Sequence, residues 1–567
     1  MIKKILLFFV LCVIGFVGYY IYSDMAAGPR GSAMSYEKAV DRLDRLVDKV
    51  PWRENFVQRR AKVELAGAKD LAKSLPSIDR FAKVVQPPVS ADDVAVEVFV
   101  STEKSGTGID GIMVEIAEDF NARNVALDDG KTGKVIIRKI ASGTGYEYIA
   151  SRKYLPDAFS PSNHLWVRMA EAHGIAMSPI RERVVGNVAG VVMKEAVADQ
   201  LKSTYGSLNV QSIIDAVVQG DLVMGYTNPF ASSTGLNFLV TVLATFADGN
   251  PDRMLSPEVV SSFESFQRGV PFVALTTLQM RDSVQNEGSL EAFVMEYQTF
   301  VNTPTLQSGY EFIPFGVRHD NPLYAVGEPG PEKMAVLERF AAFADSEAYA
   351  KVAAKYGFNP EISYEPPFGP PPGDVLVQAQ KIWKEKKDAG RPISAVFLCD
   401  VSGSMRGTRL NQLKRALLDG SRFVAPSNSI GLVLFSDRVS VVLPVKPFDL
   451  NHRAAFQAAV EDMDAGGKTA MYDGVAVSLS MLVKEKQAHP EVKPILFVLT
   501  DGQTNVGMNF SDMDRIIGGV NIPVYTIGYE ANIKELARLS SLVEAASLNA
   551  DEEEIEYKIG SLLNAQM

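Results

Sequence analysis

The chain has 567 residues, of which 47% are hydrophobic and 22% charged, a composition typical of globular proteins with large cores. The length predicts roughly three to four domains. Lysine and arginine total 57 against 68 aspartates and glutamates, so the net charge of −11 argues against a nucleic-acid-binding protein. The two cysteines, Cys12 and Cys399, both lie in apolar segments, and no disulfide is expected.

The first feature in chain order is an uncharged apolar segment at residues 5–22, which follows two lysines and ends in a tyrosine-rich stretch. Its length is near the minimum for a membrane-spanning helix, and the lysines favour a cytoplasmic N-terminus. We predict a transmembrane signal anchor at residues 1–24, with the rest of the chain outside the cytoplasm. A cleavable signal peptide is the alternative, because residues 26–28 are small enough for a cleavage site.

The next segment has a helical period. Between residues 36 and 83, apolar side chains such as Leu43 and Val47 fall on one stripe, with charged side chains opposite. We predict a helical stalk, or a brace on the next domain, over residues 34–90. Pro87 and Pro88 end this pattern and indicate a domain boundary.

The central segment, residues 93–362, alternates strand-like and helix-like patterns. Strands are expected at 94–100 and 134–140, and helices at 109–121 and 146–153. Regular alternation of strands and helices predicts an α/β architecture with parallel sheets.

Polar motifs follow the predicted strands or begin the predicted helices of this segment. They are Ser101-Thr102-Glu103-Lys104, Ala141-Ser142-Gly143-Thr144-Gly145, Phe159-Ser160-Pro161-Ser162 and Gly225-Tyr226-Thr227-Asn228-Pro229. With them, the segment resembles the type II periplasmic substrate-binding proteins of bacterial uptake systems. The resemblance implies two lobes around a ligand cleft, with the chain crossing between lobes near residues 183–192 and returning near 300–325.

Such a cleft presents backbone amides at helix N-termini together with short hydroxyl side chains, which suits a small anionic or carboxylate-bearing ligand. Because serine and threonine also favour helix N-caps, each hydroxyl has that simpler interpretation. The candidate ligand-binding residues, some of them implied only by the resemblance, are Ser101, Thr102, Ser142, Gly143, Thr144, Ser160, Asn228, Ser232, Ser233 and Thr234.

A proline-rich linker follows, and residues 374–387 are predicted to form a connector helix, so that residues 363–390 join two domains. After it, the apolar run at 395–399 predicts a strand buried on both faces of a sheet. The strand ends in Asp400, and Ser402 and Ser404 follow at alternate positions, where extended side chains share one side. Thr469 in a glycine-rich loop, and Asp501 after the strand predicted at 494–499, are expected at the same sheet edge.

These five side chains offer only oxygen donors, which suits Mg²⁺, with Mn²⁺ or Ca²⁺ as alternatives. The pattern Asp400-x-Ser402-x-Ser404, with Thr469 and Thr500-Asp501-Gly502, resembles the metal-ion-dependent adhesion site of von Willebrand factor type A domains. The resemblance covers residues 391–567 and implies a doubly wound, Rossmann-like parallel sheet. It also implies that a protein partner completes the metal coordination with a carboxylate. An N-cap with two ordinary turns is the alternative interpretation.

The sequence offers little for catalysis. A haloacid-dehalogenase phosphatase would need a second aspartate where Ser402 stands, and the five histidines form no metal-spaced cluster. We therefore expect a membrane-anchored, extracytoplasmic bacterial binding protein rather than an enzyme, located in the periplasm or at the cell surface. Its alternative is a solute-binding receptor of a transport or sensing system, in which the C-terminal domain is a docking module.

Overall fold

The computed structural model describes residues 34–63, 75–270, 272–274, 277, 280–281, 291–359, 362, 364–387, 391–502, 504–529, 536, 539–540, 547–550, 559–560, 562–563 and 566–567. The predicted transmembrane anchor at residues 1–24 lies outside this set. Within the set, none of the helices combines the length and the apolar character needed to cross a membrane.

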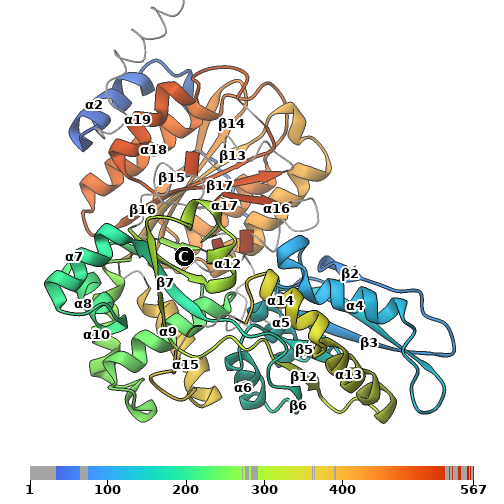
Figure 1. Ribbon diagram of the computed structural model, residues 1–567. Coiled ribbons are helices and arrows are strands. Elements are labelled where there is room, and N and C mark those ends of the chain that lie inside the picture. Colours follow the sequence, from blue (N-terminus) through green and yellow to red (C-terminus); the bar gives the residue numbers. More distant parts are fainter. Residues whose placement is uncertain are drawn as a thin grey trace, which may run out of the picture.

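The C-terminal domain is built on a seven-stranded sheet (Figure 1). Its order is β1 (Trp52–Glu54), β15 (Val439–Pro447), β14 (Ser429–Phe435), β13 (Ile393–Asp400), β16 (Lys493–Thr500), β17 (Val524–Tyr529) and β18 (Ser547–Ala550). Five neighbouring strands of this order are parallel, namely β14, β13, β16, β17 and β18. The strand β15 runs antiparallel to β14. The sheet is therefore mixed, because a short turn of three residues, 436–438, joins β14 directly to β15 and reverses the chain.

Both faces of β13 are covered, as its continuous apolar sequence predicts. All of its residues are buried. Phe397 packs in a core with the helices α16 (Thr408–Gly420) and α17 (Leu450–Glu461), and Leu398 packs in a core with α18 (Met471–Ala488) and α19 (Phe510–Val520). Helices on both faces are what the predicted doubly wound α/β fold requires.

The N-terminal segment belongs to this C-terminal domain. The helix α2 (Tyr36–Val47) buries Ala39, Leu43 and Val47 in the same core as α18 and α19. The strand β1 then pairs in parallel with β15. The expectation of one helical segment to residue 83 is wrong for the described residues after Val47, because Pro51 interrupts the helix and the chain pairs with a sheet edge instead.

This placement predicts that a change in α2 destabilises a domain more than 300 residues later in the sequence. Leu43 is completely buried, so Leu43→Ala should lower the free energy of unfolding by about 2–5 kcal/mol through lost burial and a cavity. In the same variant, amide hydrogen exchange in β13 and β16 should become faster. Arg42→Ala, at an exposed position of the same helix, is the matched control, and equal effects of the two variants would contradict the placement.

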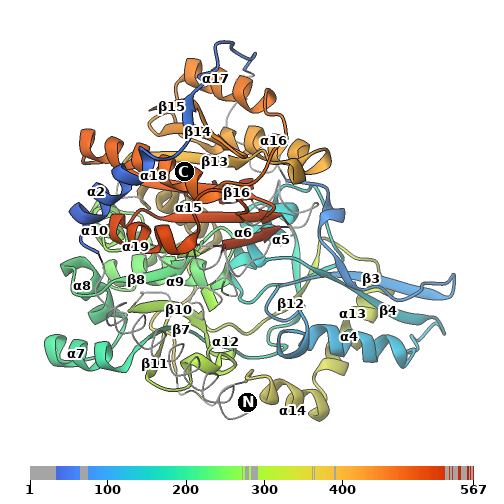
Figure 2. The same ribbon diagram turned by 90° about the horizontal axis from the view of Figure 1, so that it is seen from above.

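The central segment forms two lobes with one sheet each (Figure 2). The sheet of lobe one has the order β2 (Lys83–Val85), β4 (Thr132–Lys139), β3 (Asp93–Val100), β5 (Ala158–Ser160), β12 (Leu323–Val326) and β6 (Met177–Arg181). The sheet of lobe two has the order β11 (Tyr310–Pro314), β7 (Ala189–Lys194), β10 (Ala292–Glu296), β8 (Met224–Thr227) and β9 (Phe272–Ala274). The pairs β4–β3–β5 and β10–β8–β9 are parallel as predicted, and the other pairs of these two sheets are antiparallel.

The chain passes between the lobes twice, once between β6 and β7 and once between β11 and β12. Both positions agree with the crossings expected near 183–192 and 300–325. The two connections pair with each other, since Asn187 N donates to His319 O at 2.8 Å and His319 N donates to Asn187 O at 3.0 Å. They therefore form one hinge of two antiparallel segments.

The predicted connector helix is present as α15 (Gly373–Lys386), and it does more than connect domains. It packs against α6 (Leu165–Ala172) of lobe one and against α9 (Ser233–Phe246) and α10 (Pro257–Gln267) of lobe two. Trp383, completely buried, donates from Nε1 to the Tyr226 hydroxyl at 2.6 Å, and Gln380 donates to Pro229 O at 2.8 Å. The helix α15 thus spans both lobes and opposes their separation.

Candidate functional site

The end of β13 places Asp400 at the carboxyl edge of the C-terminal sheet, completely buried. Its Oδ1 accepts a hydrogen bond from Ser402 N at 2.8 Å, and its Oδ2 accepts one from the Thr500 hydroxyl at 2.5 Å. Because Thr500 ends the neighbouring strand β16, this bond ties two strand ends together. The Asp400 carboxylate is held by both of its oxygens.

A chain of hydroxyl contacts leads from this carboxylate to the next one. The Ser402 and Ser404 hydroxyls lie 3.0 Å apart, and Ser404 Oγ donates to Asp501 Oδ1 at 2.7 Å. The other oxygen of Asp501 accepts from Arg409 Nη1 at 2.8 Å. Four of the five predicted metal ligands therefore lie in one connected cluster.

The loop of Thr469 is fixed to the same edge through its backbone. Gly403 N donates to Gly467 O at 3.0 Å, and Thr469 N donates to the Asn505 side chain at 2.9 Å. Gly467 has a φ of +85°, and a Cβ at this position would lie 1.9 Å from Asp437 Oδ1, so only glycine fits. Three loops distant in sequence thus meet where parallel strands end.

The electrostatics of the cluster favour an added cation. Burial raises the pKa of the Asp400 carboxyl and nearby Asp501 raises it further, while hydrogen bonds from Thr500 and Ser402 oppose this shift. In the described part of the chain no group of three or more histidine, cysteine or acidic side chains is arranged for metal binding. The cluster instead combines two carboxylates with hydroxyls, a donor set that suits Mg²⁺.

Sequence reasoning missed two contributors to this site. Thr500 was part of the Thr500-Asp501-Gly502 motif, but its hydroxyl was given no role, and it anchors Asp400. Arg409, in the first turn of α16, pairs with Asp501 and had no recognisable signal. The Arg409 guanidinium supplies positive charge beside Asp501, and a bound cation would share that carboxylate with it.

The second candidate site lies between the two lobes of the central segment. Of its ten predicted residues, Thr102 is partly exposed and the others are buried. Gly143, in the first turn of α5 (Ser142–Ala150) of lobe one, donates its N–H to Ala231 O of lobe two at 3.2 Å. A Cβ on Gly143 would lie 1.8 Å from Phe230 O, so the lobes touch at a glycine. The lobes are closed on each other here.

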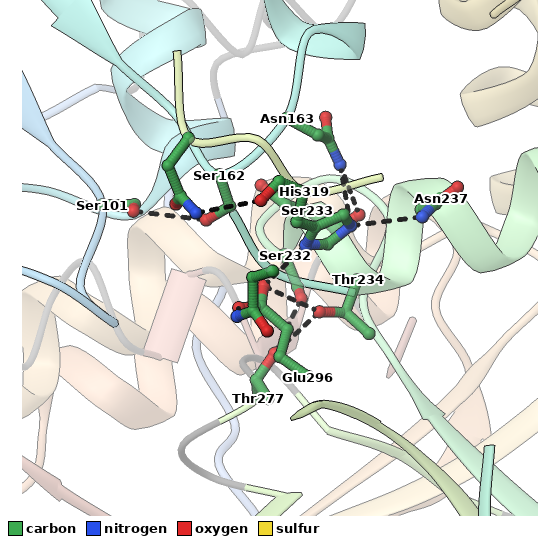
Figure 3. A network of polar contacts seen from close by, with 12 residues as sticks. Ser101, Ser162, Asn163, Ser232, Ser233, Thr234, Asn237, Thr277, Glu296 and His319 are labelled. Atoms are coloured by element: carbon green, nitrogen blue, oxygen red, sulfur yellow. Dashed lines mark hydrogen bonds and ion pairs between the residues drawn. The ribbon is translucent and has the colours of Figure 1, made fainter. Parts of the chain in front are cut away.

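In lobe two, the predicted hydroxyls at the start of α9 have partners within the protein (Figure 3). Ser232 caps α9 by accepting from Gly235 N at 3.3 Å, which is the simpler interpretation given above. Ser233 Oγ accepts from Trp166 Nε1 at 2.9 Å, and Thr234 Oγ1 donates to Glu296 Oε1 at 3.2 Å.

Glu296 is the centre of this network. It is buried, and besides Thr234 it accepts from His319 Nδ1 at 2.8 Å and from Asn187 Nδ2 at 2.7 Å. His319 Nε2 faces the Asn163 and Asn237 amides at 3.1 and 3.2 Å, so the hydrogen-bond pattern assigns the ring proton to Nδ1. The protein's own carboxylate therefore occupies the N-terminal end of α9, where the sequence suggested a ligand anion.

Lobe one contributes two hydroxyls without partners among the residues that the structure describes. Ser160 Oγ and Thr102 Oγ1 are buried atoms and accept or donate no hydrogen bond within that part of the chain. Beside them, Lys104 Nζ donates to Ser160 O, Pro161 O and Asn321 Oδ1 at 2.9, 3.0 and 3.1 Å. A buried polar atom without a hydrogen-bond partner costs free energy. A ligand that hydrogen-bonds to these two hydroxyls would therefore gain more binding free energy than one that contacts hydroxyls already paired.

The remaining predicted residues of the cleft have other contacts or roles. Ser142 Oγ accepts from Ser162 N at 3.3 Å, and Ser162 Oγ donates to Ser101 Oγ at 3.2 Å. Asn228 accepts from Phe230 N at 2.8 Å and shapes the loop that meets Gly143, and Thr144 is a buried residue of α5. Sequence reasoning gave no role to the buried charges Glu103 and Lys104, although both stand within a quoted motif.

Glu103 makes the stability of the central segment depend on pH. Burial, and then the nearby charge of Glu296, raise the pKa of Glu103 from its ordinary value to about 6, against the opposing effects of Lys104 and His319. The folded state therefore holds this proton more tightly than the unfolded state, and stability should fall by about 2 kcal/mol as pH rises from 4.5 through 6. Burial also lowers the pKa of the Lys104 ammonium, against the opposing charges of Glu103 and Glu296.

The measurement compares melting temperatures of wild type and Glu103→Gln between pH 4.5 and 7. The variant carries a neutral amide at every pH, so it should gain stability relative to wild type as pH rises. Glu118→Gln, at an exposed position of α4 (Ile112–Ala122), is the control and should run parallel to wild type. A constant difference between Glu103→Gln and wild type across this range would show that Glu103 is not perturbed.

Comparison with known proteins gives the class of each part. Residues 395–558 match the model of the von Willebrand factor type A domain, and residues 104–359 match that of the bacterial extracellular solute-binding proteins. The chain thus combines a solute-binding domain with a von Willebrand factor type A (vWA) domain, and the parts lie where the sequence motifs predicted them.

Curated relatives are similar to about a quarter of the chain. Inter-alpha-trypsin inhibitor heavy chain H3 from Homo sapiens is 32% identical over 154 residues, which are 25% of this chain and 17% of the relative. The corresponding protein from Bos taurus gives the same values. The chain therefore spans less than a fifth of the length of these relatives.

Two solved structures are each similar to a part of the chain. A von Willebrand factor type A protein from Catenulispora acidiphila is 21% identical, with 31% of this chain and 42% of that chain covered and a TM-score of 0.29. The sulfate-binding protein SubI from Mycobacterium tuberculosis H37Rv is 14% identical, with 51% and 91% covered and a TM-score of 0.33.

Proposed function

We propose that this protein is an extracytoplasmic, membrane-anchored binding protein whose vWA domain captures a protein partner through a divalent metal ion, in the first place Mg²⁺. The observation that supports the proposal is the cluster at the end of β13, where Asp400, Ser402, Ser404 and Asp501 are linked by contacts of 2.7 to 3.0 Å. Mn²⁺ and Ca²⁺ take the same oxygen donors and are the alternatives.

In this proposal the five side chains hold the ion and leave part of its coordination to the partner. Ser402 and Ser404 would coordinate it, and Asp400 and Asp501 would position it directly or through waters. Thr469 would join when a carboxylate of the partner arrives. When bound, the ion supplies positive charge that attracts that carboxylate.

The experiment is capture of membrane proteins by the full-length chain, with Mg²⁺ and with a chelator. The proposal expects a discrete partner that is retained in Mg²⁺, lost in chelator and regained when Mg²⁺ is added back. Uptake of Mn²⁺ by the protein alone, followed by electron paramagnetic resonance, tests the metal site without the partner. Capture that persists in chelator would overturn the proposal.

A second candidate function is a solute-binding receptor of a transport or sensing system, with the vWA domain as its docking module. The observation that favours it is the pair of unpartnered hydroxyls, Ser160 Oγ and Thr102 Oγ1, at a cleft between hinged lobes. A small anionic ligand would meet the buried carboxylates Glu103 and Glu296, and the charge of Lys104, next to Glu103, would offset part of their repulsion.

Melting of the full chain with sulfate, phosphate and acetate separates the two functions. A ligand at 100 times its dissociation constant should stabilise the folded chain by about 2.7 kcal/mol. If the protein is a solute-binding receptor, Ser160→Ala should remove the ligand-induced shift in melting temperature. The vWA-domain variants described in the Discussion should retain that shift. A binding protein that captures partners only through the vWA domain needs no such shift.

A further inference from the structure

A cavity of about 940 Å³ lies where three parts of the chain meet. Its walls come from α5 of lobe one, from α15, and from the base of the vWA domain at residues 391–393 and 425–428. Its lining includes Ile393, the first residue of β13, whereas the metal cluster is at Asp400, the last. The cavity is thus distinct from the metal cluster and from the polar network of Figure 3.

The charges around this cavity are mainly positive. Four cationic side chains and two carboxylates line it, namely Lys381, Lys384, Lys387 and Arg391 against Glu147 and Glu385. Lys387 also lies over the Trp383 ring, with Nζ 5.6 Å from the ring centroid. The excess of cationic groups gives the cavity a potential that attracts anions.

Tyr146 supplies an independent observation. It lines the cavity, it is 4% exposed, and its ring packs against Trp166 and His173. Its phenol makes no hydrogen bond to any other residue that the structure describes, and burial and Glu147 raise its pKa. A hydroxyl that lines a cavity is available as a donor to a guest molecule.

The apolar part of the lining limits the kind of guest. Phe230 and Val377 contribute hydrocarbon surface next to the charged end of α15. The volume is far larger than an inorganic oxyanion needs and lies in the range of about 300–1,000 Å³ that small organic ligands occupy. The positive charge and the apolar lining of the cavity favour a molecule with an acid group and an apolar body.

We propose that this cavity binds a small organic anion, with its acid group toward Lys381 and Tyr146 and its apolar body against Phe230 and Val377. Because the walls belong to lobe one, to Phe230 of lobe two, to α15 and to the vWA domain, the bound molecule holds these parts in the arrangement seen here. Binding is therefore linked to the closed lobes, and it stabilises that arrangement by mass action.

The probe is 8-anilinonaphthalene-1-sulfonate, an aromatic anion that fluoresces in apolar sites, titrated into the full-length protein. Two variants alter the cavity from different sides: Lys381→Glu reverses a charge on α15, and Ser427→Trp fills the cavity from an exposed position of the vWA domain. Each should weaken the dye roughly tenfold. Lys38→Glu on α2 and Ser203→Trp on α7 (Glu195–Tyr205) are controls at exposed positions outside the cavity and should bind like wild type.

A second measurement places the site. Hydrogen exchange in α5 and in the segment at 391–393 should slow when the dye binds wild type, and it should not change in Ser427→Trp. Nile red, a neutral dye, should respond to Ser427→Trp but not to Lys381→Glu, since only the anion needs the charge. Absence of dye binding to wild type, or equal binding by both cavity variants and their controls, would overturn the proposal.

Discussion

Ser402→Ala is expected to abolish Mg²⁺-dependent capture of the partner and to weaken Mn²⁺ binding by at least about tenfold, the lower range for changes around a metal site. The change removes one hydroxyl of the cluster, whose hydrogen bonding within the described part of the chain is to Ser404 Oγ alone, so the fold should keep its stability within about 1 kcal/mol. Thr469→Val should also abolish capture, because it removes a hydroxyl while retaining shape and backbone contacts.

Asp400→Ala should have the same effect on capture with a larger loss of stability. It leaves the buried Thr500 hydroxyl and Ser402 N without their acceptor. Ser421→Ala is the matched control, since Ser421 is a buried serine of the same domain whose hydroxyl donates to Leu418 O, distant from the cluster. Full Mg²⁺-dependent capture by Ser402→Ala and Thr469→Val would show that the partner binds elsewhere.

Trp383→Ala is expected to lower the free energy of unfolding by about 3–5 kcal/mol, because it removes a completely buried aromatic side chain from α15. Amide hydrogen exchange should increase more in the two lobes than in the rest of the molecule. Without this contact α15 holds lobe two less firmly, so amide exchange should speed up in α9, α10 and α6 before global unfolding. Urea unfolding and hydrogen exchange measure the two effects.

Trp383→Phe is the matched variant for this position. It keeps an aromatic ring but loses the Nε1 donor to Tyr226, so it should cost about 1 kcal/mol more than its smaller volume alone. If Trp383→Ala unfolds at the wild-type urea concentration and leaves exchange in both lobes unchanged, α15 is only a connector, as its position in the sequence suggested.

The sequence was most informative where spacing alone carries geometry. Alternate positions put Asp400, Ser402 and Ser404 on one side of an extended segment, and the ends of parallel strands meet at one edge, so the meeting of these residues with Asp501 could be predicted. The lobe crossings came instead from the resemblance to type II periplasmic substrate-binding proteins, which implies where the chain passes from one sheet to the other.

The sequence was least informative where a polar group has several competent partners. Thr234 could cap a helix, face a ligand or bind a carboxylate, and only the fold shows that Glu296, 62 positions away, takes it. The same holds for Arg409, whose partner Asp501 is 92 positions away. Local preference says that such a side chain needs a partner, and tertiary packing chooses which one.

By itself, therefore, the sequence determined the α/β class, the two successive units and the loops that carry the oxygen donors, because each follows from local periodicity and from which residues end a buried strand. Tertiary structure alone decided that α2 and β1 complete the vWA domain and that α15 spans both lobes. It also decided that a positively lined cavity lies where the lobes, α15 and the vWA domain meet. An apolar stripe or a charged helix face is the same in sequence whatever it packs against, and the partner is chosen only when distant surfaces compete to be buried.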